Sequence, residues 1–68
     1  MAEEALNAEV MAVERALEEH GPVEREELAR MVGARHWGPG AFSESLRLAV
    51  ATGGARRVSR RVYGPPKT

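Results

Sequence analysis

The sequence predicts a mainly α-helical fold, with three helices followed by a small β-hairpin. Three segments repeat apolar residues at helical spacing, glycines separate them, and the tail places valines and a tyrosine around a short turn. At 68 residues the chain has room for one domain. We therefore expect a single domain over residues 1–68, with its core over about 5–64 and a flexible tail over 65–68.

The first helix is predicted over residues 3–20. Four larger apolar residues recur at spacings of four, three and four, which places them on one helical face: Leu6, Val10, Val13 and Leu17. Gly21 and Pro22 follow this segment. They end the helix, because glycine readily adopts the left-handed capping conformation and proline cannot continue a helix.

The second helix is predicted over residues 25–32, after a short extended segment at Val23. Leu28, Met31 and Val32 are expected to face inward, with Ala29 beside them. Glu26 and Glu27 lie in its first turn, where the helix dipole favours negative charge. Gly33 ends this helix.

The third helix is predicted over residues 39–52, with Pro39 in the first helical position after a glycine cap. Its buried face is expected to consist of Phe42, Leu46, Ala49 and Val50. Ser43, Glu44 and Arg47 fall on the other side of this helix, which predicts that they face solvent or a ligand.

A β-hairpin is predicted over residues 55–63, whose strand-forming residues are Val58, Val62 and Tyr63. Residues 59–60 would form its tip. The two largest aromatic residues have expected structural roles: Trp37 covers the core from a loop, and Tyr63 enters the core from the hairpin.

The order of these elements, together with three sequence segments, resembles a winged helix-turn-helix domain. The segments are GPVEREELARMVG (residues 21–33), FSESLRLAVATGG (residues 42–54) and ARRVSRRVYGP (residues 55–65). The resemblance implies a small DNA-binding protein that regulates transcription. Its third helix would lie toward the major groove, and its hairpin, or wing, would contact phosphates or the minor groove. The linker over residues 33–38 is longer than the three or four residues of the simple motif.

The chain is neutral overall, but its charges are separated along the sequence. Residues 1–27 carry nine Glu against two Arg, whereas residues 28–68 carry seven Arg and one Lys against a single Glu. Arginine binds phosphate through paired hydrogen bonds, so the basic half is the predicted interface with double-stranded DNA. Its candidate nucleic-acid-binding residues are Arg35, Ser43, Arg47, Arg56, Arg57, Arg60 and Arg61.

Other binding functions remain open. The acidic first helix and Glu44 on the presumed DNA-facing side are also compatible with a winged-helix module that binds protein, and RNA binding has the same charge requirement. A strip of small residues on the first helix permits close approach of another helix, from the same chain or from a second subunit. The residues expected in a homodimer contact are Ala5, Met11, Ala12 and Ala16.

Several residue types argue against other classes of protein. Without cysteine, the chain forms neither disulfides nor zinc–thiolate sites. His20 and His36 are far apart and Ser43 has no paired base, so we expect no metal, no cofactor and no enzymatic activity. No apolar stretch reaches the roughly 20 residues of a membrane span, which predicts a cytoplasmic protein. The scarcity of amide and thiol side chains is typical of thermophile proteins.

Overall fold

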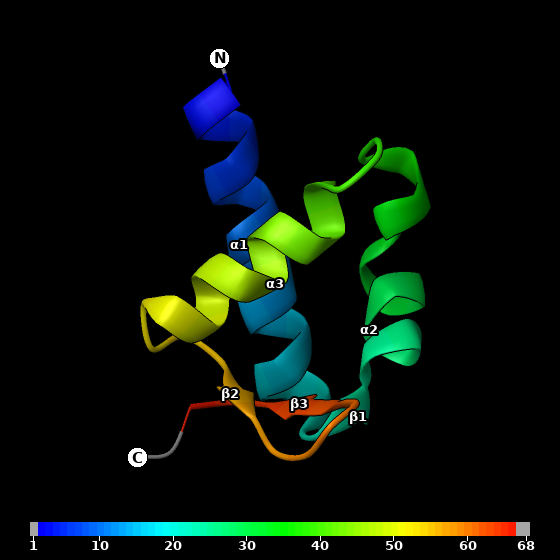
Figure 1. The fold of residues 1–68 in the computed structure, drawn as a ribbon, viewed down its shortest axis with the longest axis vertical. Coiled ribbons are helices and arrows are strands. Elements are labelled where there is room, and N and C mark those ends of the chain that lie inside the picture. The colour runs from blue at the N-terminus through cyan, green and yellow to red at the C-terminus, as the bar shows by residue number, and fades with distance from the viewer. Residues whose placement is uncertain (1, 67–68) are drawn as a thin grey trace.

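Three helices stand on a small antiparallel sheet in the computed structural model, which describes residues 2–66 and the side chains of residues 6–66 (Figure 1). The helices are α1 (Ala2–His20), α2 (Arg25–Val32) and α3 (Ala41–Ala51), with the 3₁₀ helix η1 (Ala34–His36) between α2 and α3. The strands are β1 (Val23–Glu24), β2 (Arg56–Arg57) and β3 (Val62–Gly64). This arrangement confirms the predicted mainly α, three-helix winged helix-turn-helix layout.

The predicted apolar face of α1 forms the centre of the core. Val13 and Leu17 are fully buried, because α2 and α3 both pack against this part of α1. Leu6 and Val10 are half-buried. They lie toward the N-terminal turns of α1, which project past α3 (Figure 1).

The prediction for α2 is confirmed at both ends. Leu28 is fully buried, and Met31 and Val32 pack partly buried against the core. Glu24 occupies the capping position without a side-chain hydrogen bond to the helix, and Gly33 ends the helix in a left-handed conformation. Packing of the apolar face, rather than capping at the N-terminus, therefore stabilises this short helix.

The predicted start of α3 is wrong by two residues. The helix begins at Ala41, and Gly40 is its capping residue. Gly38 and Gly40 have φ angles of 92° and 77°, a left-handed backbone that interrupts the helix on both sides of Pro39. Pro39 is therefore part of the loop and does not occupy the first helical position.

The predicted buried face of α3 is wrong at one position. Phe42, Leu46 and Ala49 are buried as expected, but Val50 is 37% exposed. The remaining buried position is Ser45, whose hydroxyl lies 3.4 Å from a carboxylate oxygen of Glu9 and donates a hydrogen bond to it. A small residue at this position lets α3 pack closely against α1.

The sheet has the strand order β1-β3-β2, and all its pairs are antiparallel. β2 and β3 form the predicted hairpin, called the wing below, and β1 pairs with its β3 strand. The predicted tip at residues 59–60 is wrong by one residue. The Val62 N–H donates to the Ser59 carbonyl at 3.4 Å and the Ser59 N–H donates to the Val62 carbonyl at 3.2 Å, so Arg60 and Arg61 form the turn.

The two large aromatic residues support the core as predicted. Trp37 and Tyr63 are both partly buried and pack against it. The ring centroids of Trp37 and Phe42 are 6.2 Å apart with a tilted geometry, which is a favourable arrangement for two aromatic rings. Trp37 therefore closes the core between η1 and α3.

The small-residue strip on α1 faces its own chain over part of its length. Ala16 is buried in the core, which corrects its predicted role in a homodimer contact. Ala12 is half-buried, and Met11 is 59% exposed. The side chain of Ala5 and residues 67–68 of the predicted tail lie outside the described part of the chain.

Candidate nucleic-acid interface

A groove of about 460 Å³ lies between α3 and the wing. Its rim carries three guanidinium groups from three different elements: Arg25 of α2, Arg47 of α3 and Arg57 of β2. Its other lining residues are Ser43, Leu46, Val50, Ala51 and Tyr63. The lining of the groove therefore combines three cationic groups with a largely apolar surface.

The spacing of residues on α3 explains why this helix forms one wall of the groove. Ser43 lies four residues before Arg47, and Val50 and Ala51 lie three and four residues after it, so these residues share the face opposite the core. On the other wall, Arg57 is paired with Tyr63 across the strands of the wing. Directly paired residues lie on the same side of a sheet, so both side chains reach the groove.

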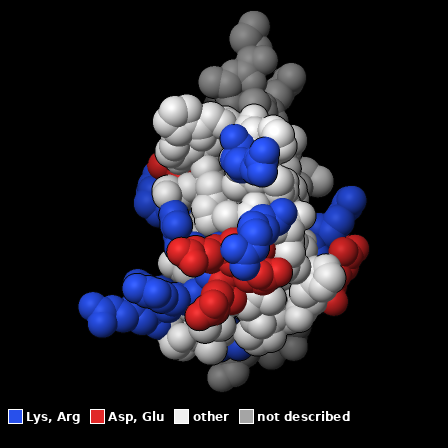
Figure 2. Space-filling view, turned by 90° about the vertical axis from the view of Figure 1, so that its right-hand side faces the viewer, with Lys and Arg blue, Asp and Glu red and all other residues white. Residues whose placement is uncertain are grey.

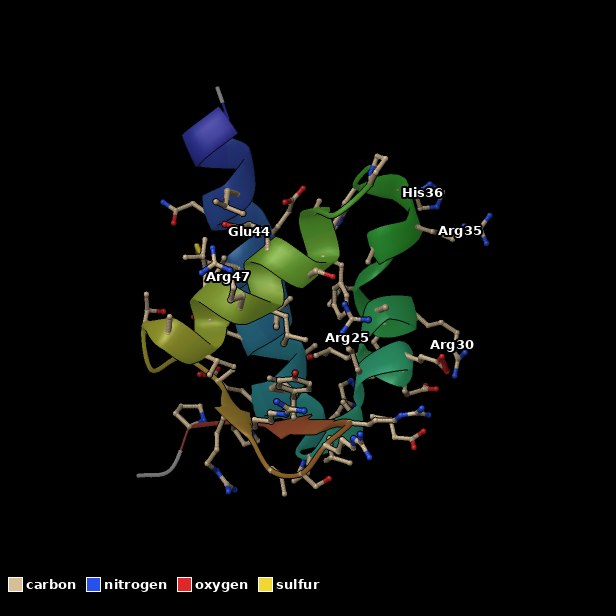
Figure 3. The ribbon with its side chains drawn as sticks, viewed as in Figure 1. Arg25, Arg30, Arg35, His36, Glu44 and Arg47 are labelled. Atoms are coloured by element: carbon tan, nitrogen blue, oxygen red, sulfur yellow. The ribbon has the colours of Figure 1, made fainter. Side chains whose placement is uncertain are left out.

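Arg25 is the functional candidate that the sequence did not reveal. Its backbone N–H donates to the Arg61 carbonyl at 2.7 Å, and its guanidinium donates to the Ser43 hydroxyl. The same guanidinium lies over the Phe42 ring, 5.1 Å from the centroid, in cation–π geometry. Arg25 therefore connects the sheet, α2 and α3 at the groove (Figure 3).

Arg47 is paired with a carboxylate on its own helix. Its guanidinium donates to Glu44 at 2.6 Å, one turn earlier on the exposed side of α3. Both side chains remain open to solvent, with exposed fractions of 65% for Arg47 and 47% for Glu44. The pair therefore places a positive and a negative group side by side on α3 (Figure 3).

Arg57 closes the turn of the wing. Its Nε donates to the Ser59 carbonyl at 3.3 Å, and one terminal nitrogen donates to the Arg60 carbonyl at 2.8 Å. These bonds satisfy two carbonyl groups of the exposed turn and fix the guanidinium near the groove. Since arginine has five N–H donors, further donors remain for a ligand.

The other predicted basic residues do not join the groove. Arg56 is paired with Gly64, and side chains alternate along a strand, so it lies on the opposite side of the sheet from Arg57. Arg60 is exposed in the turn. Arg61 lines a separate depression with Glu24 and Glu26. Of the seven predicted residues, the groove brings together three: Ser43, Arg47 and Arg57.

Arg35 lies far from the groove. It is on η1, at the end of α2 that points away from the sheet, beside His36 (Figure 3). The face formed by α2 mixes red and blue side chains, whereas blue side chains project together at the lower left, at the sheet end of the molecule (Figure 2). The cationic surface therefore does not extend continuously from the wing to Arg35.

An ion pair on α2 contributes to the mixed charge of that face. Arg30 donates to Glu27, and this hydrogen bond and the carboxylate charge raise the pKa of Arg30 above its usual value. The Arg30–Glu27 pair has the same three-residue spacing as the Arg47–Glu44 pair. It lies on α2 away from the groove and so provides a natural control for experiments on α3.

The described part of the chain shows no other kind of site. No group of three or more potential metal-ligating side chains occurs among the described residues, and within the same range no helix is both long and apolar enough to cross a bilayer. No known protein family, curated protein or solved structure matches the chain. The candidate site is therefore identified by its geometry alone.

Proposed function

We propose that this protein binds double-stranded DNA in the cytoplasm and regulates transcription. In this proposal α3 faces the major groove, and the wing contacts phosphates or the minor groove. One observation supports it above the others: guanidinium groups from α2, α3 and the wing converge on the groove beside the exposed face of α3. Phosphate oxygens are strong acceptors for guanidinium groups, which bind them in a bidentate geometry.

The exposed face of α3 is compatible with close approach to base edges. Ser43 and Ala51 are small, and Arg47 extends from the same face. A side chain such as arginine can contact either guanine or a phosphate from this position. We therefore propose Arg25, Ser43, Arg47 and Arg57 as the principal DNA contacts, with Arg60 and Arg61 at the wing tip as additional phosphate contacts.

The test compares two double variants that remove the same amount of charge. Replacing Arg47 and Arg57 by alanine removes two groove cations, and we expect the affinity for a labelled duplex at low salt to fall roughly tenfold for each lost contact. Replacing Arg30 and Arg35 by alanine removes two cations away from the groove. Fluorescence anisotropy should show a much smaller effect for this second variant.

The salt dependence of binding gives an independent readout. Each phosphate contact contributes about 0.9 to the slope of log affinity against log salt. The Arg47 and Arg57 double variant should therefore lose about 0.9 of this slope where Arg57 alone contacts a phosphate, and about 1.8 where both residues do. Equal losses of affinity and slope in both double variants would show that only net charge matters. Absence of duplex binding by the unaltered chain at low salt would disprove the proposal.

A second candidate function is supported by the apolar part of the groove lining. Leu46, Val50, Ala51 and Tyr63 offer apolar contacts in a groove that three guanidinium groups also line, which suits an acidic, amphipathic segment of a partner protein as well. Co-purification of a protein partner at high salt, together with no retention on DNA, would favour this function. Competition by RNA against the labelled duplex would distinguish RNA binding from DNA binding.

We also propose that the protein acts as a homodimer. The structure measures about 31 Å along its longest axis, so one copy covers no more than about one turn of a duplex, which is roughly 34 Å long. Such a small contact gives limited specific affinity, and two copies are the usual solution. The exposed surface of α1 around Met11 is the proposed contact.

A further inference from the structure

The ion pair between Glu44 and Arg47 occupies an unusual position for a surface that would approach DNA. A carboxylate repels phosphates, yet Glu44 lies on the exposed face of the helix that forms one wall of the cationic groove. An exposed ion pair of this kind contributes little to folding stability. Glu44 lies in the first turn of α3, where the helix dipole favours a carboxylate, but this stabilisation does not depend on Arg47 and leaves open what the pair does toward a duplex.

The pair leaves hydrogen-bonding groups of both types free. Arg47 uses one terminal nitrogen in the contact, and Glu44 uses one oxygen, Oε2. A guanidinium has five N–H donors and a carboxylate has two acceptor oxygens, so a donor fork and an acceptor remain next to each other.

This pattern is complementary to one base pair in the major groove. Guanine presents two adjacent acceptors, N7 and O6, which match the donor fork of an arginine, and cytosine presents an N4–H donor, which matches a carboxylate. An A·T pair has no base with two adjacent acceptors on this edge. The complementarity is therefore specific for G·C.

We propose that Glu44 and Arg47 together select a G·C base pair, with Arg47 donating to guanine and Glu44 accepting from the cytosine amino group. The inference rests on the proposed binding of double-stranded DNA and adds a sequence preference to it. Glu44 then has two opposite effects. It lowers affinity for every duplex by repelling phosphates, and it raises discrimination at one base-pair position.

The test uses the full chain and a pool of duplexes with a randomised segment. The unaltered protein, Glu44→Ala and Glu27→Ala are each used to select bound duplexes, which are then sequenced. Glu27→Ala is the matched control, because it removes the same charge from an equally spaced pair on α2. Circular dichroism checks that both variants keep the fold, as expected for exposed side chains.

We expect the unaltered protein and Glu27→Ala to enrich a G·C pair at one position, with discrimination of at least about fivefold against A·T. Glu44→Ala keeps the Arg47 contact to guanine but loses the contact to cytosine, so it should weaken this enrichment and bind random duplexes as tightly as, or more tightly than, the unaltered protein. If Glu44→Ala retains the same enrichment, the inference is wrong and the proposed function stands. If the unaltered protein binds duplexes without any G·C preference, the inference is also wrong. If the unaltered protein binds no duplex, the inference and the proposed function are both wrong.

Discussion

Arg25 has more structural roles than any other charged residue of the groove. Its backbone bonds to the wing through Arg61, its guanidinium bonds to Ser43, and it covers the ring of Phe42. These contacts hold the side chain half-buried in one orientation. An immobilised guanidinium loses less conformational entropy when it binds a phosphate than a freely rotating side chain does.

Replacing Arg25 by lysine should therefore weaken binding although the charge is kept. Lysine has no planar group to cover Phe42 and no donor fork, so we expect duplex affinity to fall roughly tenfold. The free energy of unfolding should fall by less than about 1 kcal/mol, because an ammonium group still interacts with the Phe42 ring but cannot stack on it as a guanidinium does. Anisotropy and urea denaturation measure the two effects.

Arg30→Lys is the control for this substitution, since Arg30 is an exposed arginine on the same helix. Arg30→Lys should change neither the duplex affinity nor the free energy of unfolding appreciably. Equal affinities for Arg25→Lys and the unaltered chain would show that Arg25 acts only through its charge.

Individual buried positions could be predicted only partly from the sequence. The apolar face of α1 followed directly from its spacing, because leucine and valine recur on one side. On α3 the same reasoning selected Val50, whereas the helix buries Ser45 against α1. A hydroxyl that bonds to Glu9 can be buried at low cost, and this partner is 36 residues away in sequence. Local patterns cannot reveal such a partner.

At the scale of elements, the wing depends on a side chain from its own first strand. The turn contains Arg60 and Arg61, which are not typical residues of a two-residue hairpin turn. Arg57 compensates by donating to the carbonyl groups of Ser59 and Arg60. The conformation of the wing tip and the position of a groove cation are therefore coupled.

This coupling predicts different effects for two neighbouring arginines. Arg57→Ala should increase hydrogen exchange at the amide of Val62, whose N–H bonds across the turn, because the closing contacts are lost. Arg60 contributes only its backbone carbonyl to these contacts, so Arg60→Ala should leave the exchange rate unchanged. An unchanged rate in Arg57→Ala, measured by NMR, would show that the turn closes without this side chain.

The boundaries of the elements were predictable to different degrees. Both ends of α2 followed from its apolar spacing and from Gly33. The start of α3 did not follow from the sequence, since proline suits a first helical position. The helix begins later because Gly38 and Gly40 have positive φ angles, which are set by the path of the loop. The wing was predictable, but the register of its β3 strand was not. This register is set by the pairing of β3 with both β1 and β2.

At the scale of the whole molecule, separation of charge in the sequence is not the same as separation in space. The acidic residues Glu24 and Glu26 belong to the negative half of the sequence, yet they line a depression with Arg61 of the wing. Folding therefore limits the cationic surface to the groove and the wing tip. The candidate site contains three of the predicted residues and one, Arg25, that had been counted with the acidic half.

The proposed homodimer gives a prediction at this scale. Sedimentation velocity should show a mass of two chains that dissociates on dilution. Met11→Lys should shift the equilibrium toward the monomer, because it places a charge in the apolar part of the proposed contact. Val58→Lys is a matched substitution at an exposed site outside α1, and it should leave the equilibrium between monomer and dimer unchanged. A monomer mass at every concentration would contradict the proposed dimer.

The most direct test of the central claim is an NMR titration of the isotope-labelled chain with a short duplex. The claim is that the groove between α3 and the wing is the surface that binds DNA. We expect the largest chemical-shift changes at Arg25, along the exposed face of α3 and in the wing, with little change on α1 or at Arg35. Shift changes confined to α1 or η1, or none on addition of duplex at low salt, would contradict the claim.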